Sequence, residues 1–286
     1  MKISGKVKVV GIFGDPVEQT LSPYMHNAAF EALGLELVYV PFHVRQGMLK
    51  NAVDGVRALD ILGVNVTIPF KERVMEYLDS VDDEALSIGA VNTIVNAGGK
   101  LRGYNTDGRG YWTTLIGETG FDPRGKTIIV LGAGGSGRAI IFSVLGKGPK
   151  TVIIANRTVK KAESLAKEFG RRSPGVDIKA MGLDIAEPMR GADLLINTTP
   201  VGMTGIGARH PFLPLKNLPP SAIVSDIVYK PLDTPLMKDA REKGLRVHGG
   251  LGMLVWQGAL SFSLWTGADA PVEVMRLAAA QALEVS

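Results

Sequence analysis

Apolar positions in the first hundred residues alternate between short continuous runs and stretches with helical spacing. The runs have the length of buried strands, and the periodic stretches indicate helices on one side of a sheet. Ser22-Pro23 begins the first periodic stretch, with serine suited to an N-cap and proline to the first helical position. A hairpin is predicted around Gly98-Gly99. The predicted strands are 7–14, 37–44 and 61–68, and the predicted helices start at Ser22 and cover 46–58 and 71–81.

The pattern changes after a Pro/Gly turn at residues 121–126. From there, β-branched runs typical of central parallel strands alternate regularly with helical stretches. Such alternation predicts an α/β protein with a doubly wound parallel sheet, and a unit boundary near residues 105–122. The predicted strands here are 127–132, 151–157, 193–199 and 222–229, and the predicted helices are 136–146 and 159–170.

The stretch from Gly249 to Ala268 contains no formal charge and is long enough to span a bilayer. It includes Gln257 and two serines and has no basic flank, so we interpret it as a loop followed by a buried helix. The N-terminal apolar run is too short for a signal peptide. We therefore expect a soluble, cytoplasmic protein with no membrane association.

Length and composition narrow the class further. A chain of 286 residues suggests about two domains. The net charge of +4 is spread along the chain, which argues against a nucleic-acid partner. The absence of cysteine excludes disulfides, iron–sulfur clusters and cysteine nucleophiles, and fits a reducing compartment. The histidines lack ligand spacing, so no metal site is expected; they are His26, His43, His210 and His248.

A glycine-rich loop follows the predicted strand at 127–132. Gly132, Gly134 and Gly137 satisfy the G-x-G-x-x-G pattern between a strand and a helix. There, backbone N–H groups at a helix N-terminus can approach a pyrophosphate. The alternative is an ordinary strand-to-helix turn. The predicted cofactor-binding residues of the loop are Gly132, Ala133, Gly134, Gly135 and Ser136.

The next predicted strand ends in Asn156-Arg157-Thr158, with Lys161 shortly after. A site for NAD would carry an acidic residue here to bind the ribose 2′-hydroxyl. Arginine instead suits a 2′-phosphate, which it can bind through two hydrogen bonds. The sequence therefore predicts NADP as the cofactor.

Several longer motifs accompany this loop. They are GDPVEQTLSPYMHN (14–27), NVTIPFK (65–71), GAVNTIV (89–95), GYNTDGRG (103–110), INTTPVGM (196–203), DIVYKPLDTPL (226–236) and GGLGMLVWQGA (249–259). Together they resemble the shikimate dehydrogenase family almost from end to end. The resemblance implies NADP-dependent interconversion of 3-dehydroshikimate and shikimate in aromatic amino-acid biosynthesis.

The resemblance also implies a domain organisation. A Rossmann-type NADP domain at 108–250 would be inserted into a discontinuous α/β substrate domain formed by 1–107 and 251–286. The active site would lie in the cleft between these domains.

The resemblance makes Lys71 and Asp107 the catalytic pair. Reduction of a ring ketone needs a proton source at the carbonyl oxygen, and Lys71 can supply it. We expect Lys71 in the first turn of the helix at 71–81, where the helix dipole disfavours the ammonium form. Asp107 would hold the amine. The alternatives are a surface lysine and an aspartate that caps the next helix.

Hydroxyls near a helix N-terminus suit a carboxylate substrate, and Thr20 and Ser22 provide them. The family usually has serine at both positions, so Thr20 departs from it. By resemblance, other polar side chains bind the ring hydroxyls, namely Asn65, Thr67, Asn92, Thr106, Tyr229 and Gln257. Further residues are expected near the cofactor, namely Asp83, Thr198, Ile227 and Gly250.

Two alternatives remain open. A quinate/shikimate dehydrogenase of broader specificity would have to fit an extra hydroxyl near Thr20. A non-catalytic NADP-binding regulator could share the fold, although Lys71, Asp107 and Gln257 argue against it. The sequence leaves open a homodimer.

Overall fold

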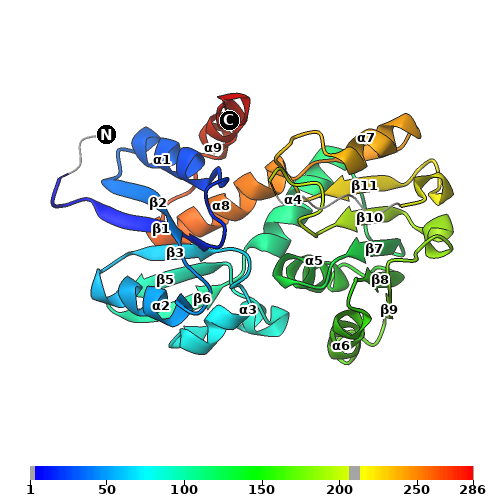
Figure 1. Cartoon of the computed structure of the whole chain (residues 1–286), viewed down its shortest axis with the longest axis horizontal. Coiled ribbons are helices and arrows are strands. Elements are labelled where there is room, and N and C mark those ends of the chain that lie inside the picture. Colours follow the sequence, from blue (N-terminus) through cyan, green and yellow to red (C-terminus); the bar gives the residue numbers. More distant parts are fainter. Residues whose placement is uncertain (1–3, 206–212, 286) are drawn as a thin grey trace. The chain divides into compact units, whose positions relative to one another are not determined.

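The chain forms two compact units, each built around its own six-stranded sheet (Figure 1). The computed structural model describes residues 4–205 and 213–285. Unit 1 comprises Met1–Gly110 and Leu254–Ser286, and unit 2 comprises Tyr111–Met253. The chain changes unit inside two helices, α4 (Asp107–Thr119) and α8 (Leu251–Thr266), whereas the sequence suggested changes after residues 107 and 250.

Unit 1 holds a mixed sheet in the order β2-β1-β3-β5-β6-β4. β1 lies parallel to β2 and β3, and β5 runs antiparallel to both β3 and β6. The strands are β1 (Lys8–Gly14), β2 (Leu37–His43), β3 (Gly63–Val66), β4 (Ser80–Val81), β5 (Thr93–Ala97) and β6 (Lys100–Tyr104). The hairpin predicted at Gly98-Gly99 is confirmed, and both glycines have the positive φ that its tight turn requires.

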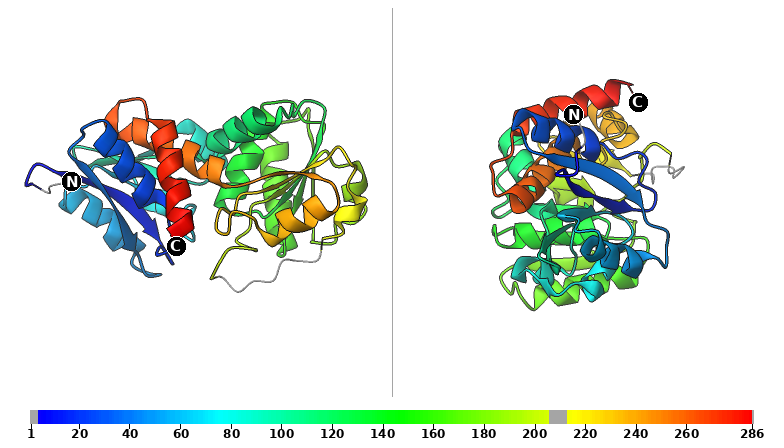
Figure 2. Two further views of the ribbon diagram at one scale, coloured as in Figure 1. Left: turned by 90° about the horizontal axis from the view of Figure 1, so that it is seen from above. Right: turned by 90° about the vertical axis from the view of Figure 1, so that its left-hand side faces the viewer.

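Helices cover both faces of this sheet. One face carries α2 (Leu49–Ala58), the 3₁₀ helix η1 (Arg73–Tyr77) and α3 (Asp83–Ile88), which contribute to one hydrophobic core. The other face carries α1 (Ser22–Ala32) and the C-terminal part of α8, whose Phe30 and Phe262 rings stack. The last helix, α9 (Val272–Val285), packs against α1, as Figure 2 shows.

Unit 2 holds an entirely parallel sheet in the order β12-β11-β10-β7-β8-β9. This order reverses between β7 and β10, which defines a doubly wound Rossmann-type sheet. The fold class predicted from the sequence is therefore confirmed. The strands are β7 (Thr127–Leu131), β8 (Thr151–Ala155), β9 (Asp177–Met181), β10 (Leu194–Asn197), β11 (Ile223–Asp226) and β12 (Arg246–His248).

Both faces of the unit 2 sheet are buried, because successive side chains of a strand point to opposite faces. In β7, Ile128 and Val130 join a core with helices α4, α5 (Gly135–Leu145) and α6 (Val159–Gly170). Ile129 and Leu131 join a second core with α7 (Pro235–Glu242) and the 3₁₀ helices η2 (Pro188–Gly191) and η3 (Leu215–Asn217). The left view of Figure 2 shows α4, in green, and α7, in orange-yellow, on opposite sides of this sheet.

The helix predicted at 71–81 is wrong. Only η1 forms, and the chain then turns into β4, which pairs with β6. Asp79 explains the change: its carboxylate accepts the N–H of Leu101 and a hydrogen bond from Arg57, which holds the segment at the sheet edge. These hydrogen bonds lower the pKa of Asp79 to about 2.

The N-cap predicted for Ser22 is also wrong. Leu21 occupies the N-cap of α1, and Ser22 is the first helical residue. The backbone N–H of Ser22 donates to Oγ1 of Thr20 at 3.3 Å, so Thr20 supports the start of the helix. The charge-free stretch at 249–268 folds mainly as α8, and no helix in the described part of the chain has the length and apolarity to cross a membrane.

Candidate active site

Most of the predicted substrate residues lie at one edge of the unit 1 sheet, namely the edge formed by the ends of several strands and not by an outer strand. In the strand register, Phe13 of β1 aligns with Val66 of β3, and Asn65 aligns with Thr93 of β5 and through it with Tyr104 of β6. The chain segments that leave β1, β3 and β6 and the segment that enters β5 therefore share this edge. Residues far apart in sequence meet here because parallel and antiparallel strands end side by side.

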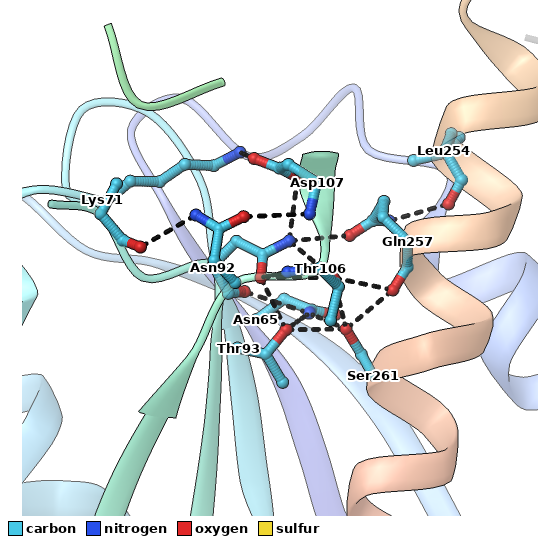
Figure 3. Close-up of polar contacts among 11 residues, drawn as sticks. Asn65, Lys71, Asn92, Thr93, Thr106, Asp107, Leu254, Gln257 and Ser261 are labelled. Atoms are coloured by element: carbon cyan, nitrogen blue, oxygen red, sulfur yellow. Dashed lines mark hydrogen bonds and ion pairs between the residues drawn. The ribbon is translucent and has the colours of Figure 1, made fainter. Parts of the chain in front are cut away.

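A hydrogen-bonded network, here called the amide cluster, occupies this edge (Figure 3). Its members are Asn65, Asn92, Thr93, Thr106, Gln257 and Ser261. Asn92 lies at its centre and is only 2% exposed. Its Nδ2 donates to Oγ1 of Thr106 at 2.9 Å and lies 3.3 Å from Oε1 of Gln257, while its Oδ1 accepts the N–H of Thr106.

Lys71 and Asp107 form an ion pair beside this cluster. Nζ of Lys71 lies 2.6 Å from Oδ2 of Asp107, and the two side chains are 12% and 3% exposed. The other carboxylate oxygen of Asp107 accepts a hydrogen bond from Asn92 Nδ2 at 2.8 Å. The structure thus brings together the two residues that the sequence singled out for catalysis.

The local setting of Lys71 differs from the expectation. Lys71 lies in a turn before the 3₁₀ helix η1 and not in the first turn of an α-helix. Its backbone carbonyl instead accepts the N–H of Val91 at 2.7 Å, which fixes the turn next to Asn92. Asp107 is the first residue of α4, and its N–H donates to Oδ1 of Asn105.

Three members of the polar network had not been predicted. Ser261 lies four residues after Gln257, on the same face of α8, so its place beside a predicted site residue was readable from helical spacing. Thr93 directly follows Asn92. Tyr39, which donates from its hydroxyl to Oδ1 of Asn65 at 2.7 Å, sits within an apolar strand, and nothing in its sequence context signals this role.

Thr20, Ser22 and Thr67 lie at the same edge but outside the amide cluster. The loop that carries Thr20 follows β1, and Thr67 follows the neighbouring strand β3. A Cβ atom on Gly14 would come within 2.6 Å of the Thr67 methyl group, so the two loops are tightly packed. Ser22 is buried, and Thr20 and Thr67 are partly exposed.

The glycine loop of unit 2 has the geometry of a tight strand-to-helix turn. Gly132 has a φ of 108°, and a Cβ atom on it would lie 2.6 Å from Oγ1 of Thr198. A Cβ atom on Gly137 would lie 2.5 Å from the carbonyl oxygen of Gly132. Gly134 is the N-cap of α5 and has open space where a side chain would be. The helix N-terminus therefore remains accessible to an anion.

The basic residues after β8 surround the start of α6. Arg157, Thr158 and Lys161 are exposed, and Arg157 forms no ion pair with any other residue in the described ranges. Arg138, by contrast, binds Glu168 with two hydrogen bonds. Asn156 connects the two loops, because its Oδ1 accepts the N–H of Ala133 at 3.3 Å.

A second group of predicted cofactor residues lies at the ends of β10 and β11. Ile227 follows β11, and its N–H donates to the carbonyl of Asn197. Gly250 packs directly against the Ile227 backbone, leaving no room for a side chain. Tyr229, predicted to bind substrate, lies in the same segment of unit 2, whereas Asp83, predicted to bind cofactor, is an exposed residue of α3 in unit 1.

Buried Asp226 organises this segment and was not predicted. Its Oδ1 accepts hydrogen bonds from Asn197 Nδ2 and from the N–H of Val228, and its Oδ2 accepts one from the Thr234 hydroxyl. The carboxylate therefore holds together the loops that follow β10 and β11.

Three of the four histidines lie in the described part of the chain. In the part of the chain that the structure describes, no three His, Cys, Asp or Glu side chains converge to hold a metal ion. His26 and His248 are buried, and burial lowers their pKa values to about 3 and about 4. His43 binds Asp15, and His210 lies outside the described residues.

Comparisons with known proteins agree with this architecture. Residues 12–94 match the model of the shikimate dehydrogenase substrate binding domain. Residues 116–204 match that of shikimate/quinate 5-dehydrogenase, and residues 250–279 match that of the shikimate 5′-dehydrogenase C-terminal domain.

Individual relatives match over nearly their whole length. The shikimate dehydrogenase (NADP⁺) of Methanopyrus kandleri is 48% identical, over 96% of each chain. A crystal structure of a shikimate dehydrogenase in complex with NADP⁺ is 44% identical, with a TM-score of 0.91 over 99% of this chain and 98% of that one. The Thermus thermophilus enzyme, solved with NADP(H) and shikimate, is 39% identical, with a TM-score of 0.85 over 97% of this chain and all of that one.

The parallel sheet with its glycine loop and the buried lysine–aspartate pair define a two-unit dehydrogenase of the dinucleotide-binding class. The relatives match almost the entire chain, so the class can be narrowed to one family of dehydrogenases. The chain belongs to the shikimate dehydrogenase family.

Proposed function

We propose that this protein is an NADP-dependent shikimate dehydrogenase that reversibly reduces 3-dehydroshikimate to shikimate in aromatic amino-acid biosynthesis. The observation that carries the proposal is the buried Lys71–Asp107 pair. It places a proton donor beside a cluster of neutral amides and hydroxyls, in a chain that is 48% identical to the shikimate dehydrogenase (NADP⁺) of Methanopyrus kandleri. Neutral amides and hydroxyls can both donate and accept hydrogen bonds, as a polyol substrate requires.

The residues present in unit 2 fit NADP. Gly132 and Gly137 keep the strand-to-helix turn tight, and the open space at Gly134 allows a pyrophosphate to approach the N-terminus of α5. The exposed guanidinium of Arg157 suits a 2′-phosphate, with Thr158 and Lys161 beside it. Asn156, Thr198, Ile227 and Gly250 are proposed to shape the rest of this surface, and Asp83 to contribute from α3 of unit 1. When bound, NADPH supplies the hydride.

Lys71 would move the proton. During reduction its ammonium donates a proton to the carbonyl oxygen of the substrate, and during oxidation the neutral amine takes the proton from the hydroxyl. Asp107 orients the amine through the 2.6 Å contact, and Asn92 fixes Asp107 by occupying its other oxygen. The low exposure of both side chains keeps water away from the exchange.

The substrate would be held by groups around this pair. Thr20 and Ser22, next to the N-terminus of α1, are proposed to bind the carboxylate. The remaining substrate-binding residues are proposed to contact the ring hydroxyls: Thr67, Asn92, Thr106, Tyr229 and Gln257. Of these, Thr67 is partly exposed at the shared sheet edge, where a ring could reach it.

A Lys71→Ala substitution tests the proposal. We expect kcat for shikimate oxidation to fall by about 10²–10⁴-fold, because general acid–base catalysis contributes about that much. The dissociation constant of NADPH should stay unchanged, since Lys71 is proposed to contact the substrate and not the cofactor. Absorbance at the NADPH band measures turnover with NADP and with NAD, and fluorescence titration measures binding.

Lys50→Ala provides the matched control, because Lys50 is an exposed lysine of α2 paired only with Asp54 among the described residues. It should keep wild-type turnover. Wild-type protein without activity on shikimate would refute the proposed function, and an active Lys71→Ala variant would refute the role of Lys71.

Thr20 carries the question of substrate range. Its hydroxyl already accepts the N–H of Ser22, and its methyl group adds bulk that serine lacks. Comparing quinate with shikimate in wild type and in Thr20→Ser separates a strict shikimate dehydrogenase from a quinate/shikimate enzyme. We expect shikimate to be preferred in both.

We also propose that the enzyme works in the cytoplasm, apart from membranes and nucleic acids. The cysteine-free composition and the dispersed charge support this setting. We propose that the protein forms a homodimer in solution, which sedimentation equilibrium tests directly.

A further inference from the structure

Asn65 was expected to bind substrate, yet its carboxamide is directed into the protein. It is 4% exposed, and both of its polar atoms have partners in unit 1. Its Oδ1 accepts the Tyr39 hydroxyl at 2.7 Å. Its Nδ2 lies 3.0–3.2 Å from three acceptors, namely Ser261 Oγ, Asn92 O and Thr93 Oγ1.

The orientation of this carboxamide is fixed by its neighbours. The backbone carbonyl of Asn92 can only accept, so Nδ2 must face it, and Oδ1 must then face Tyr39. Without the Tyr39 hydroxyl, Oδ1 of Asn65 would be a buried acceptor that lacks this donor, and an unpaired buried acceptor lowers the free energy of unfolding.

The contacts continue from Asn65 to the ion pair. Thr93 Oγ1 lies 2.7 Å from Ser261 Oγ and donates to Oδ1 of Asn92 at 2.9 Å. Asn92 Nδ2 then donates to Asp107, which binds Lys71. Ser261 also bonds to the backbone carbonyl of Gln257, so α8 joins the same network. Figure 3 shows the Asn65-to-Lys71 part of this path.

Tyr39 itself is held by packing. The His26 ring lies parallel to it at a centroid distance of 4.4 Å, with an interplanar angle of 3°. Since burial lowers the pKa of His26 to about 3, this ring is neutral at physiological pH and supports Tyr39 without introducing a charge.

From these contacts we propose that Tyr39 and Ser261 are positioning residues. They act through Asn65 and Thr93 to fix the Asn92 carboxamide, and so hold Asp107 in the orientation that pairs with Lys71. The expected loss of turnover rests on the proposed function. The orientation of the carboxamides and of Asp107 does not depend on it.

Tyr39→Phe and Ser261→Ala test the inference, because each removes one hydroxyl and keeps most of the packing. We expect kcat for shikimate, per folded enzyme, to fall about tenfold in each, with the KM for NADP unchanged. The double variant should be little worse than either single variant, because both act on the same carboxamide. A role in stability alone would lower the melting temperature and leave kcat per folded enzyme unchanged.

The chain offers matched controls. Tyr24→Phe removes the hydroxyl of an exposed tyrosine of α1, and Ser263→Ala removes a hydroxyl from α8 two residues beyond Ser261. Both should keep wild-type kinetics.

Wild-type kcat in Tyr39→Phe would overturn the inference while leaving the proposed function intact. If the wild type itself does not act on shikimate, the proposed function fails, and a crystal structure of Tyr39→Phe still decides the inference. Displaced Asn65 and Asn92 carboxamides would support it, and unchanged ones would overturn it.

Discussion

Asn92 is the residue on which the polar groups of unit 1 converge. Its amide nitrogen donates to Asp107 and Thr106, while its oxygen accepts from the backbone of Thr106 and from Thr93. Only a carboxamide has donors and an acceptor in this arrangement. Aspartate would place a second negative charge against Asp107, and leucine would leave several buried polar groups unpaired.

His26 gives a prediction about stability at the same scale. Burial lowers its pKa to about 3, whereas an unfolded histidine titrates near 6.5. Below pH 6.5 the unfolded chain therefore binds a proton that the folded chain excludes, and the free energy of unfolding falls as pH decreases toward 3. At pH 5 the loss from this residue is about 2 kcal/mol.

His26→Phe keeps a flat ring against Tyr39 and removes the titration. Urea unfolding measures how far the free energy of unfolding falls between pH 7.5 and pH 5. We expect this fall to be about 2 kcal/mol smaller in His26→Phe than in the wild type. The comparison of pH values cancels any cost of repacking the larger ring. An unchanged pH difference would contradict the assignment of the effect to His26. His248, whose pKa burial lowers to about 4, adds to the dependence that remains.

At the scale of elements, the sequence predicted best where an element is long and buried. The predicted helix 159–170 has the bounds of α6, and the central strand β7 was found because its run is apolar on both faces. The missed strands β4, β9 and β12 lie at the lateral edges of their sheets and have partly exposed residues, and β4 and β12 are also short. Such strands depend on pairing with a neighbour, which local periodicity does not encode.

The junction between β12 and α8 gives a prediction with a control beside it. A Cβ atom on Gly250 would collide with the carbonyl group of Ile227, whose backbone is held by its bond to Asn197. Gly250→Ala should therefore destabilise the protein by about 1–3 kcal/mol and weaken NADPH binding. At Gly249 the nearest atom to such a Cβ is the flexible Met237 methyl at 3.4 Å, so Gly249→Ala should change stability by less than about 0.5 kcal/mol.

Urea unfolding and NADPH titration of the two variants provide the comparison. Equal stabilities would show that the close approach of Gly250 to Ile227 is not required.

At the scale of the whole molecule, the two units differ in how the sequence assembles them. Unit 2 is continuous in sequence and has a core on each sheet face. Unit 1 is discontinuous in sequence. Trp265 of α8 donates a hydrogen bond to the carbonyl of Ile94 and lies against Gly63 of β3. Phe262 of α8 stacks on Phe30. Residues 1–110 thus lack part of their core until the C-terminal helices are made.

This organisation predicts how fragments behave. A fragment of residues 107–253 should unfold cooperatively and bind NADPH, because its cores and glycine loop are complete. Residues 1–110 alone should not fold, whereas 1–110 joined to 254–286 by a short linker should, since Gly110 lies against the backbone of Gln257. Circular dichroism during thermal unfolding measures both. A stably folded fragment 1–110 would contradict the requirement for α8 and α9.

The pair of Lys71 and Asp107 was implied by the resemblance to the family, whereas the sequence by itself determined the α/β class, the glycine loop and the basic residues after β8. These features are encoded by local periodicity, by glycine positions and by motifs that one segment contains. Only the tertiary structure decided that Lys71 lies in a turn rather than a helix, and that Tyr39 and Ser261 share a network with Asn65 and Asn92. The physical reason is that hydrogen bonds between strand ends and α8 join residues whose separation in sequence carries no signal of their contact.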